Sequence, residues 1–325
     1  MAKRLTLAFI IAGLALVLNW ERSVAQEWPA RTIRLVVGYG AGGGTDLVAR
    51  IVAQALQEKL KQTVVVENKV GASGIVAADS VSKSEKDGYT LYLVNNAHVI
   101  VGVMTKTLPY DTLASFDPVG QVATGSLAVV TRSDFQAKNL LELIELAKRN
   151  PGKITFASVG NGTTQHFAAE LLMQSAGIEM LHVPFRNSPA ATSAVMGKHV
   201  DLMFDTVSAV LGPIQSGELR ALAVTGRERF PAIPNVPTAI ESGRMPNYEV
   251  TTWYGVVAPA GTPASVIGRL NRALNEIVGD VEVKERLAKV GAVAASSSVD
   301  AFREHMKSEF QRWNAVREKA KIEQQ

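Results

Sequence analysis

A glycine-rich turn between a buried strand and a helix, residues 33–50, constrains this chain more than any other stretch. Its sequence is IRLVVGYGAGGGTDLVAR. The five glycines of the turn let bare backbone approach a bound group closely. Thr45 or Asp46 is expected to cap the helix, whose first N–H groups carry partial positive charge. A strand, a glycine turn and a helix N-terminus together predict an anion-binding site.

The spacing of these glycines fits two interpretations. Gly38, Gly40 and Gly43 match the G-x-G-x-x-G pattern of dinucleotide-binding folds. A second strand at 63–66 ends at Glu67, about where such a fold places its ribose-binding acid. These residues permit a secreted nucleotide-dependent oxidoreductase. A tight turn with only a packing role fits them equally well.

The N-terminus argues against a nucleotide cofactor. Residues 1–25 are typical of a secretory signal peptide, with Lys3 and Arg4 before an apolar run at 5–18 and small residues before a cleavage site near Ala25-Gln26. The apolar run is short for a membrane span, and a retained anchor is the alternative. We therefore expect a soluble periplasmic protein, where nicotinamide cofactors are not normally available, and no cofactor.

Composition excludes further classes. Loss of residues 1–25 removes three of the 34 basic and one of the 30 acidic side chains, which leaves a net charge of +2. A near-neutral chain without basic runs interleaved with aromatics predicts no nucleic-acid partner. The chain has no cysteine, so it has neither a disulfide nor a cysteine-linked lipid anchor.

Strand and helix patterns alternate along the chain, which predicts an α/β fold with mainly parallel sheets and covering helices. The opening pattern recurs as a strand at 153–157, a polar glycine turn at 158–164 and a helix at 165–175. Two similar halves are therefore expected. Each half offers a polar turn at the carboxyl ends of its strands, where ligands of open α/β sheets bind.

Other elements follow from the same patterns. The last helix has an apolar stripe typical of core packing. The remaining predicted strands are 89–94, 119–131, 182–185, 200–204, 220–225 and 253–258, and the remaining predicted helices are 71–82, 140–149 and one that ends near Gly197.

No catalytic constellation is present. The chain lacks G-x-S-x-G, H-E-x-x-H, a P-loop lysine and an EF-hand loop, and its histidines have no metal-ligand spacing. We expect neither an enzyme nor a metal site. His166 can donate to a loop carbonyl or contact a ligand, and Arg186 can pair with an anion or stay solvated. Asp205 can cap the next helix or accept from a ligand, and Asn95 and Asn96 are turn formers or ligand contacts.

The order of these motifs resembles the Bug, or TctC-like, family of periplasmic substrate-binding proteins, which serve tripartite tricarboxylate transporters. The resemblance covers essentially the whole mature chain. The matching segments are 33–37, 41–46, 65–68, 87–91, 151–153, 158–166, 219–225, 236–238 and 258–263.

The resemblance implies a two-lobed type II periplasmic-binding fold with a ligand cleft between the lobes. The first lobe would comprise 26–126 and 253–325, the second 127–252, with hinge segments near 122–130 and 250–257. It further implies a monomeric receptor that delivers a small carboxylate, such as a di- or tricarboxylate, an amino acid or an aromatic acid, to a membrane permease. A ligand-presenting module for a two-component sensor is the alternative.

The same resemblance implies the site. The expected ligand-binding residues are Gly42, Gly43, Gly44, Thr45, Asn95 and Asn96 in the first lobe and Ser158, Asn161, Gly162, Thr163, Thr164 and the cleft aspartate Asp205 in the second, with Tyr39, His166 and Arg186 as secondary candidates. Two stretches depart from the family pattern, Gly38-Tyr39-Gly40 and Phe185-Arg186-Asn187. These departures bear on the distal part of the ligand. Tyr39 or Trp253 near the cleft would suit an aromatic acid.

Overall fold

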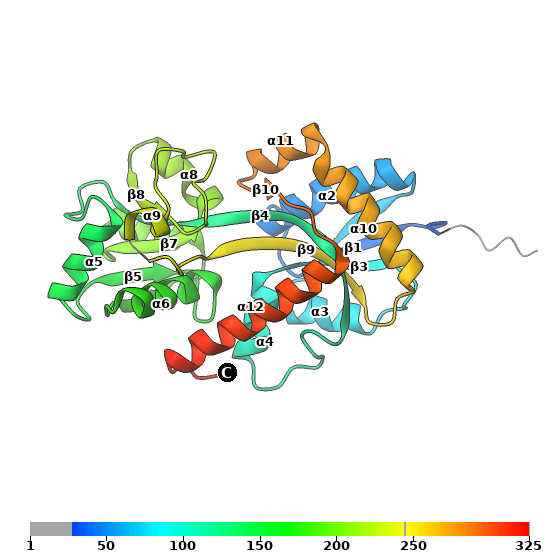
Figure 1. Ribbon diagram of the computed structural model, residues 1–325, viewed down its shortest axis with the longest axis horizontal. Helices are drawn as coiled ribbons and strands as arrows, with labels where there is room; N and C mark the ends of the chain where they lie inside the picture. The colour runs from blue at the N-terminus through cyan, green and yellow to red at the C-terminus, as the bar shows by residue number, and fades with distance from the viewer. Residues whose placement is uncertain (1–27, 244, 325) are drawn as a thin grey trace, which may run out of the picture.

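The computed structural model describes residues 28–243 and 245–324. The predicted signal peptide and its cleavage site lie outside the described residues. Ten strands form one curled sheet. Two long strands, β4 (Phe116–Arg132) and β9 (Thr251–Pro259), run side by side from one half of the molecule into the other (Figure 1).

The first half is built on the sheet β2-β1-β3-β9-β4-β10. The strands β1, β2 and β3 pair in parallel, whereas β9, β4 and β10 pair antiparallel. Helices α2, α10 and α11 cover one face, and α3, α4 and α12 the other. The bounds are β1 (Ile33–Val37), α2 (Gly44–Leu60), β2 (Val64–Asn68), α3 (Ile75–Ser82), β3 (Thr90–Asn95), α4 (Asn96–Met104), α10 (Ala264–Gly279), α11 (Val281–Lys289), β10 (Val293–Ala294) and α12 (Val299–Lys319).

In the second half, the far end of β4 pairs antiparallel with β7 and β8, and β5 pairs in parallel with β6 and β7. Helices α5, α6 and α9 cover one face, and α7 and α8 the other. The bounds are α5 (Leu140–Arg149), β5 (Thr155–Ser158), α6 (Thr164–Ala176), β6 (Leu181–Pro184), α7 (Ser188–Met196), β7 (Leu202–Thr206), α8 (Val207–Gln215), β8 (Leu219–Val224) and α9 (Ala239–Gly243).

The α/β class and the two similar halves are confirmed, but the sheets are mixed and not mainly parallel. Parallel pairing is confined to the outer strands of each half. The chain passes between the halves more than once, so β4 and β9 run in opposite directions and pair antiparallel. Along β4, residues 116–126 pair with β9 and residues 127–132 with β7 and β8. The lobe boundaries themselves stay a prediction.

Most predicted elements are confirmed with shifts of a few residues at their ends. The segment 71–82 differs, because a 3-10 turn, η1 (Ala72–Gly74), precedes α3. Ala72 and Ser73 have φ of 44° and 54°, a left-handed conformation that a continuous helix excludes. Helices α4, α9, α10 and α11 and strand β10 were not predicted, and α8 was expected only as the helix that follows Asp205.

Helix α12 ties the halves together. It crosses the sheet diagonally (Figure 1) and contacts α4 in the first half and α6 in the second. Its predicted apolar stripe is confirmed, since Phe302, Met306 and Trp313 are buried. Buried Glu309 on the same helix accepts from the indole nitrogens of Trp253 (3.3 Å) and Trp313 (2.9 Å).

Candidate ligand-binding site

A cavity of about 770 Å³ lies between the two halves, beside the carboxyl ends of β1, β3, β5 and β7. It brings together residues that the sequence placed in separate turns. The predicted site residues that line it are Tyr39, Gly42, Gly44, Thr45, Asn95, Asn96, Asn161, Gly162, Thr163 and Thr164. Residues that line it without having been predicted include Gln165, Ser188, Thr206, Ser208, Tyr254 and Lys289.

Six helices begin at this cavity. The lining includes Gly44 of α2, Ile75 of α3, Asn96 of α4, Thr164 of α6, Ser188 of α7 and Ser208 of α8, each within the first two residues of its helix. Side chains cap α4, α6 and α7, but no side-chain cap serves α2, α3 or α8. Converging helix N-termini with free N–H groups make the cavity favourable for an anion.

The first loop is the glycine-rich turn at 38–44. It is held in place by Asp46, which lies almost fully buried in the first turn of α2. The expected N-cap, Thr45 or Asp46, is wrong. Gly43 is the N-cap, because the helix starts at Gly44, at least two residues earlier than that prediction requires. Asp46 Oδ2 accepts from the Gly42 N–H (2.8 Å) and from Arg50 Nε (2.8 Å), and its Oδ1 accepts from Asn68 Nδ2 (2.9 Å). Burial works against the charge, but these hydrogen bonds lower the pKa of Asp46. The carboxylate therefore shapes the loop and leaves the N–H groups of Gly44 and Thr45 without acceptors among the described residues.

Asn95 and Asn96 have different roles. Asn95 caps α4, since its Oδ1 accepts from the Ala97 N–H (3.1 Å), and its Nδ2 donates to Thr45 Oγ1 (3.1 Å). Asn96 is 4% exposed, and its Nδ2 has no hydrogen-bond partner among the described residues. A buried amide donor without an acceptor is costly unless a bound group supplies one.

Tyr39 lies on the wall of the first half. Its hydroxyl donates to the Ser73 carbonyl (3.3 Å) or to Asn95 Oδ1 (3.4 Å). Burial raises the pKa of Tyr39 to about 12, so the phenol stays a neutral donor.

The second loop is the polar glycine turn at 158–164, and side-chain hydroxyl groups hold it in place. Thr163 caps α6: its Oγ1 accepts from the His166 N–H and donates to the Gly160 carbonyl (2.8 Å). Ser158 is fully buried behind the loop and does not line the cavity. Its Oγ bonds to His182 Nε2 (2.6 Å) and accepts from the Gly160 N–H (3.1 Å). Ser158 therefore positions the loop.

Two stacked histidines lie beneath this loop. The rings of His166 and His182 are 4.0 Å apart, and His182 also stacks on Phe156. His166 Nδ1 accepts from the Gly162 N–H (3.2 Å), and its Nε2 is 3.4 Å from Glu170. His166 thus accepts from a loop N–H, where a bond to a loop carbonyl was the structural expectation, and it does not line the cavity.

Asp205 is 1% exposed and lies behind the lining. Its Oδ1 accepts from Gln165 Nε2 (3.0 Å) and the Thr206 N–H (2.8 Å), while its Oδ2 has no partner among the described residues. Burial raises the pKa of Asp205, and the nearby Ser188 hydroxyl, Gln165 amide and Thr206 N–H limit the rise. The carboxyl therefore orients Gln165, which does line the cavity.

Three further expectations differ from the geometry. Gly43 caps α2 without lining the cavity, and Arg186 is exposed away from it. Trp253 is fully buried against α12, and its neighbour Tyr254 lines the cavity instead. Successive residues of a strand point to opposite faces, so a shift of one residue exchanges the two aromatic side chains.

The lining mixes polar and apolar side chains and is almost uncharged. Among residues 28–243 and 245–324, no aspartate or glutamate lines the cavity, and Lys289 is its single charged side chain. No group of three or more histidine, aspartate or glutamate side chains in the described part of the chain could hold a metal ion. Over the same residues, no helix has the length and apolar character needed to cross a membrane.

A family model described as the tripartite tricarboxylate transporter family receptor, TctC, matches residues 48–322. The chain belongs to this family. Because the match extends over most of the chain, the predicted Bug/TctC resemblance is confirmed. The family is one of receptors, which agrees with the absence of a catalytic constellation in the sequence.

Solved structures agree with this assignment. The periplasmic binding protein BugD is 33% identical with a TM-score of 0.77, and the match covers 92% of this chain and all of BugD. Rpa4515 of R. palustris with adipate is 31% identical with a TM-score of 0.80 over 91% of this chain and 99% of that one. MatC of Rhodopseudomonas palustris with bound malate is 29% identical with a TM-score of 0.75 over 89% and 99%. The predicted fold of a two-lobed periplasmic binding protein is confirmed.

Proposed function

We propose that this protein is a periplasmic receptor that holds a small carboxylate-bearing solute in the cavity between its halves. One observation carries the proposal: six helix N-termini converge on a cavity that no described acidic side chain lines. Such a cavity favours an anion without requiring a fixed counter-charge for each oxygen. The adipate in Rpa4515 and the malate in MatC are carboxylates, which supports the class of ligand.

One carboxylate would bind to the N–H groups of Gly44 and Thr45 and to the Asn96 amide. The loop at Asn161–Thr164 would close over the solute from the second half. Charge-assisted hydrogen bonds contribute about 1.5–3 kcal/mol each. Two or three of them supply much of the roughly −8 kcal/mol of a micromolar complex. Ser158, His166 and Asp205 would hold the loops in place without direct contact.

Closure would move the lobes 26–126 plus 253–325 and 127–252 about the crossing strands. The change of pairing partner along β4 between Ser126 and Leu127 supports this boundary. A solute that contacts both lobes favours the closed state, because only that state satisfies both ends of the ligand. A monomeric closed receptor would then present the solute to membrane permease subunits. Membership of a family of transporter receptors supports this role.

Titration calorimetry with adipate, malate and the uncharged diamide of adipate tests the proposal. We expect binding of at least one acid and none of the diamide. Thr45→Pro removes one N–H in the first helical turn, where proline is tolerated. It should weaken binding at least about tenfold. Thr45→Ala, which keeps the N–H, is the matched variant and should lose less.

Two outcomes would contradict the proposal in different ways. Failure to bind either acid, or equal binding of the diamide, would overturn the carboxylate receptor. An unchanged affinity in a folded Thr45→Pro variant would instead remove the first loop from the site. Circular dichroism of each variant establishes that it is folded.

A further inference from the structure

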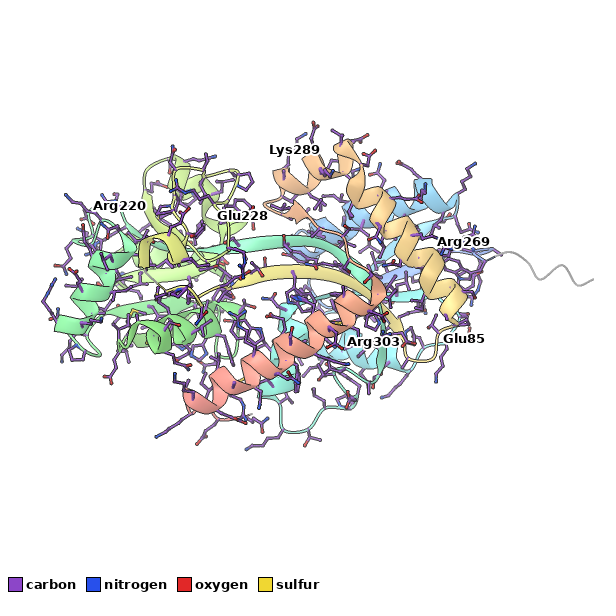
Figure 2. All side chains as sticks on the ribbon, in the orientation of Figure 1. Glu85, Arg220, Glu228, Arg269, Lys289 and Arg303 are labelled. Carbon is purple, nitrogen blue, oxygen red and sulfur yellow. The ribbon has the colours of Figure 1, made fainter. Side chains whose placement is uncertain are left out.

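Lys289 is the only charged side chain among the described residues that line the cavity. It is the last residue of α11, at the end of that helix nearest α8 of the second half (Figure 2). Two residues later, Gly291 lies against Ser208 at the start of α8. Lys289 is exposed to solvent and therefore lies at the rim of the cavity, where the two halves meet.

No ion pair or hydrogen bond engages the Lys289 ammonium within the described residues. Glu285 lies four residues earlier on the same helix, in the order that favours an (i, i+4) ion pair, yet the structure contains no such pair. Arg286 on this helix, by contrast, donates to Gln54 of α2 (2.8 Å) and lies 4.0 Å from Glu282. Lys289 is thus a cation at the cavity with no counter-charge from the protein.

The rest of the lining has no second cation. The first carboxylate of a solute can be held by neutral N–H groups, but a second carboxylate brings another negative charge into the same space. Because Lys289 is exposed, its attraction for that second charge is screened by salt and is strongest at low ionic strength. A lysine at the wall therefore favours a dianion over a monoanion of the same length.

We propose that Lys289 pairs with the second carboxylate of a dianionic solute and makes the cavity selective for diacids over matched monoacids. This inference rests on the proposed carboxylate receptor. It adds a specificity-determining residue and a class of solute. Lys289 contacts only the distal end of the ligand, so its loss should leave the binding of the first carboxylate intact.

Titration calorimetry of adipate and its monoamide against variants at position 289 tests this inference. The two probes have the same length and differ by one charge. Lys289→Met should weaken adipate binding about tenfold or more at low salt and leave monoamide binding unchanged. Lys289→Arg should retain the preference for adipate. Lys284→Met is the matched control, since Lys284 is exposed on the same helix away from the cavity and its loss should change neither affinity.

The outcomes separate the two proposals. If the unchanged protein binds adipate and Lys289→Met binds it equally well, the role of Lys289 is overturned and the receptor stands. The same conclusion follows if the monoamide binds the unchanged protein as tightly as adipate. If neither probe nor malate binds the unchanged protein, both proposals fail. An equal loss of adipate affinity in Lys284→Met would mean that the overall surface charge causes the effect, and it would overturn the specific pairing of Lys289 with the second carboxylate.

Discussion

At the scale of single residues, two glycines of the same fingerprint have opposite surroundings. A Cβ atom on Gly38 would lie 2.7 Å from the Gly74 Cα and 3.1 Å from the Tyr92 hydroxyl, whereas one on Gly40 would meet nothing within 4 Å. Gly38 is therefore required by close packing of the first turn against the turn at Gly71–Gly74. This is the packing interpretation of the G-x-G-x-x-G spacing, and it needs no dinucleotide.

Alanine substitutions at these two positions should differ in stability. Gly38→Ala should lower the free energy of unfolding by about 1–3 kcal/mol, because the backbone of Gly74 cannot move aside easily. Gly40→Ala is the matched control in the same turn and should stay within about 0.5 kcal/mol. Urea denaturation measures both. Equal effects at the two positions would contradict the packing role of Gly38.

At the scale of elements, the histidine stack couples α6 and β6 to the second loop. Burial, and to a smaller extent the neighbouring His166, lower the pKa of His182 to about 4. Burial also lowers the pKa of His98 in α4 to about 4, although its hydrogen bond with the Thr112 carbonyl acts in the opposite direction. Between pH 6.5 and 4, the unfolded chain therefore binds more protons than the native protein. The free energy of unfolding falls as the pH falls through this window. The contribution of the two neutral histidines to stability is fully present above pH 6.5.

The His182→Phe variant should flatten this acid dependence. Phenylalanine keeps the stack on Phe156 and cannot take up a proton. The slope of unfolding free energy against pH between 6.5 and 4 should decrease by at most about 1.4 kcal/mol per pH unit. Urea denaturation at several pH values measures the slope. A His98→Phe variant should remove its own contribution independently, and an unchanged slope in His182→Phe would contradict the lowered pKa.

At the scale of the whole molecule, Gly291 and Ser208 form a contact between the halves. A Cβ on Gly291 would lie 2.3 Å from Ser208 Cβ and 2.8 Å from its Cα, so the two backbones can approach this closely only with glycine. Gly291 precedes β10 in the first half, and Ser208 lies in α8 of the second. The contact therefore limits how near the halves can come.

Gly291→Ala should hold the halves apart and weaken adipate binding about tenfold. Gly152→Ala is the matched control, because Gly152 has a similar φ of 68° against 72° for Gly291 but nothing within 4 Å of an added Cβ. Both variants should lose a similar amount of stability from the left-handed backbone. Calorimetry measures the affinity, and small-angle X-ray scattering measures the separation of the halves. Equal adipate affinities in the two variants would show that the close contact between Gly291 and Ser208 is not needed for the halves to close on the ligand.

Local features of the site could be predicted from sequence because they depend on short-range chemistry. The strand and glycine turn at 33–45, the Thr163 cap and helix 140–149 all follow from neighbouring residues, and the structure confirms them. The family could also be identified from the order of these motifs. The sequence therefore predicts each turn as part of a binding site, but it does not place the two turns relative to each other.

Tertiary structure alone decided which side chains meet in the cavity. Lys289 and Thr45 are far apart in the sequence, and nothing in the pattern of α11 distinguishes Lys289 from Lys284, the other lysine of that helix. The face of β9 that points to the cavity depends on strand register, so Tyr254 lines it and Trp253 does not. The sequence by itself predicted two anion-binding turns in an α/β receptor. The charge at the far wall and the contact between the halves depend on long-range packing, which brings together residues with no local signal in common.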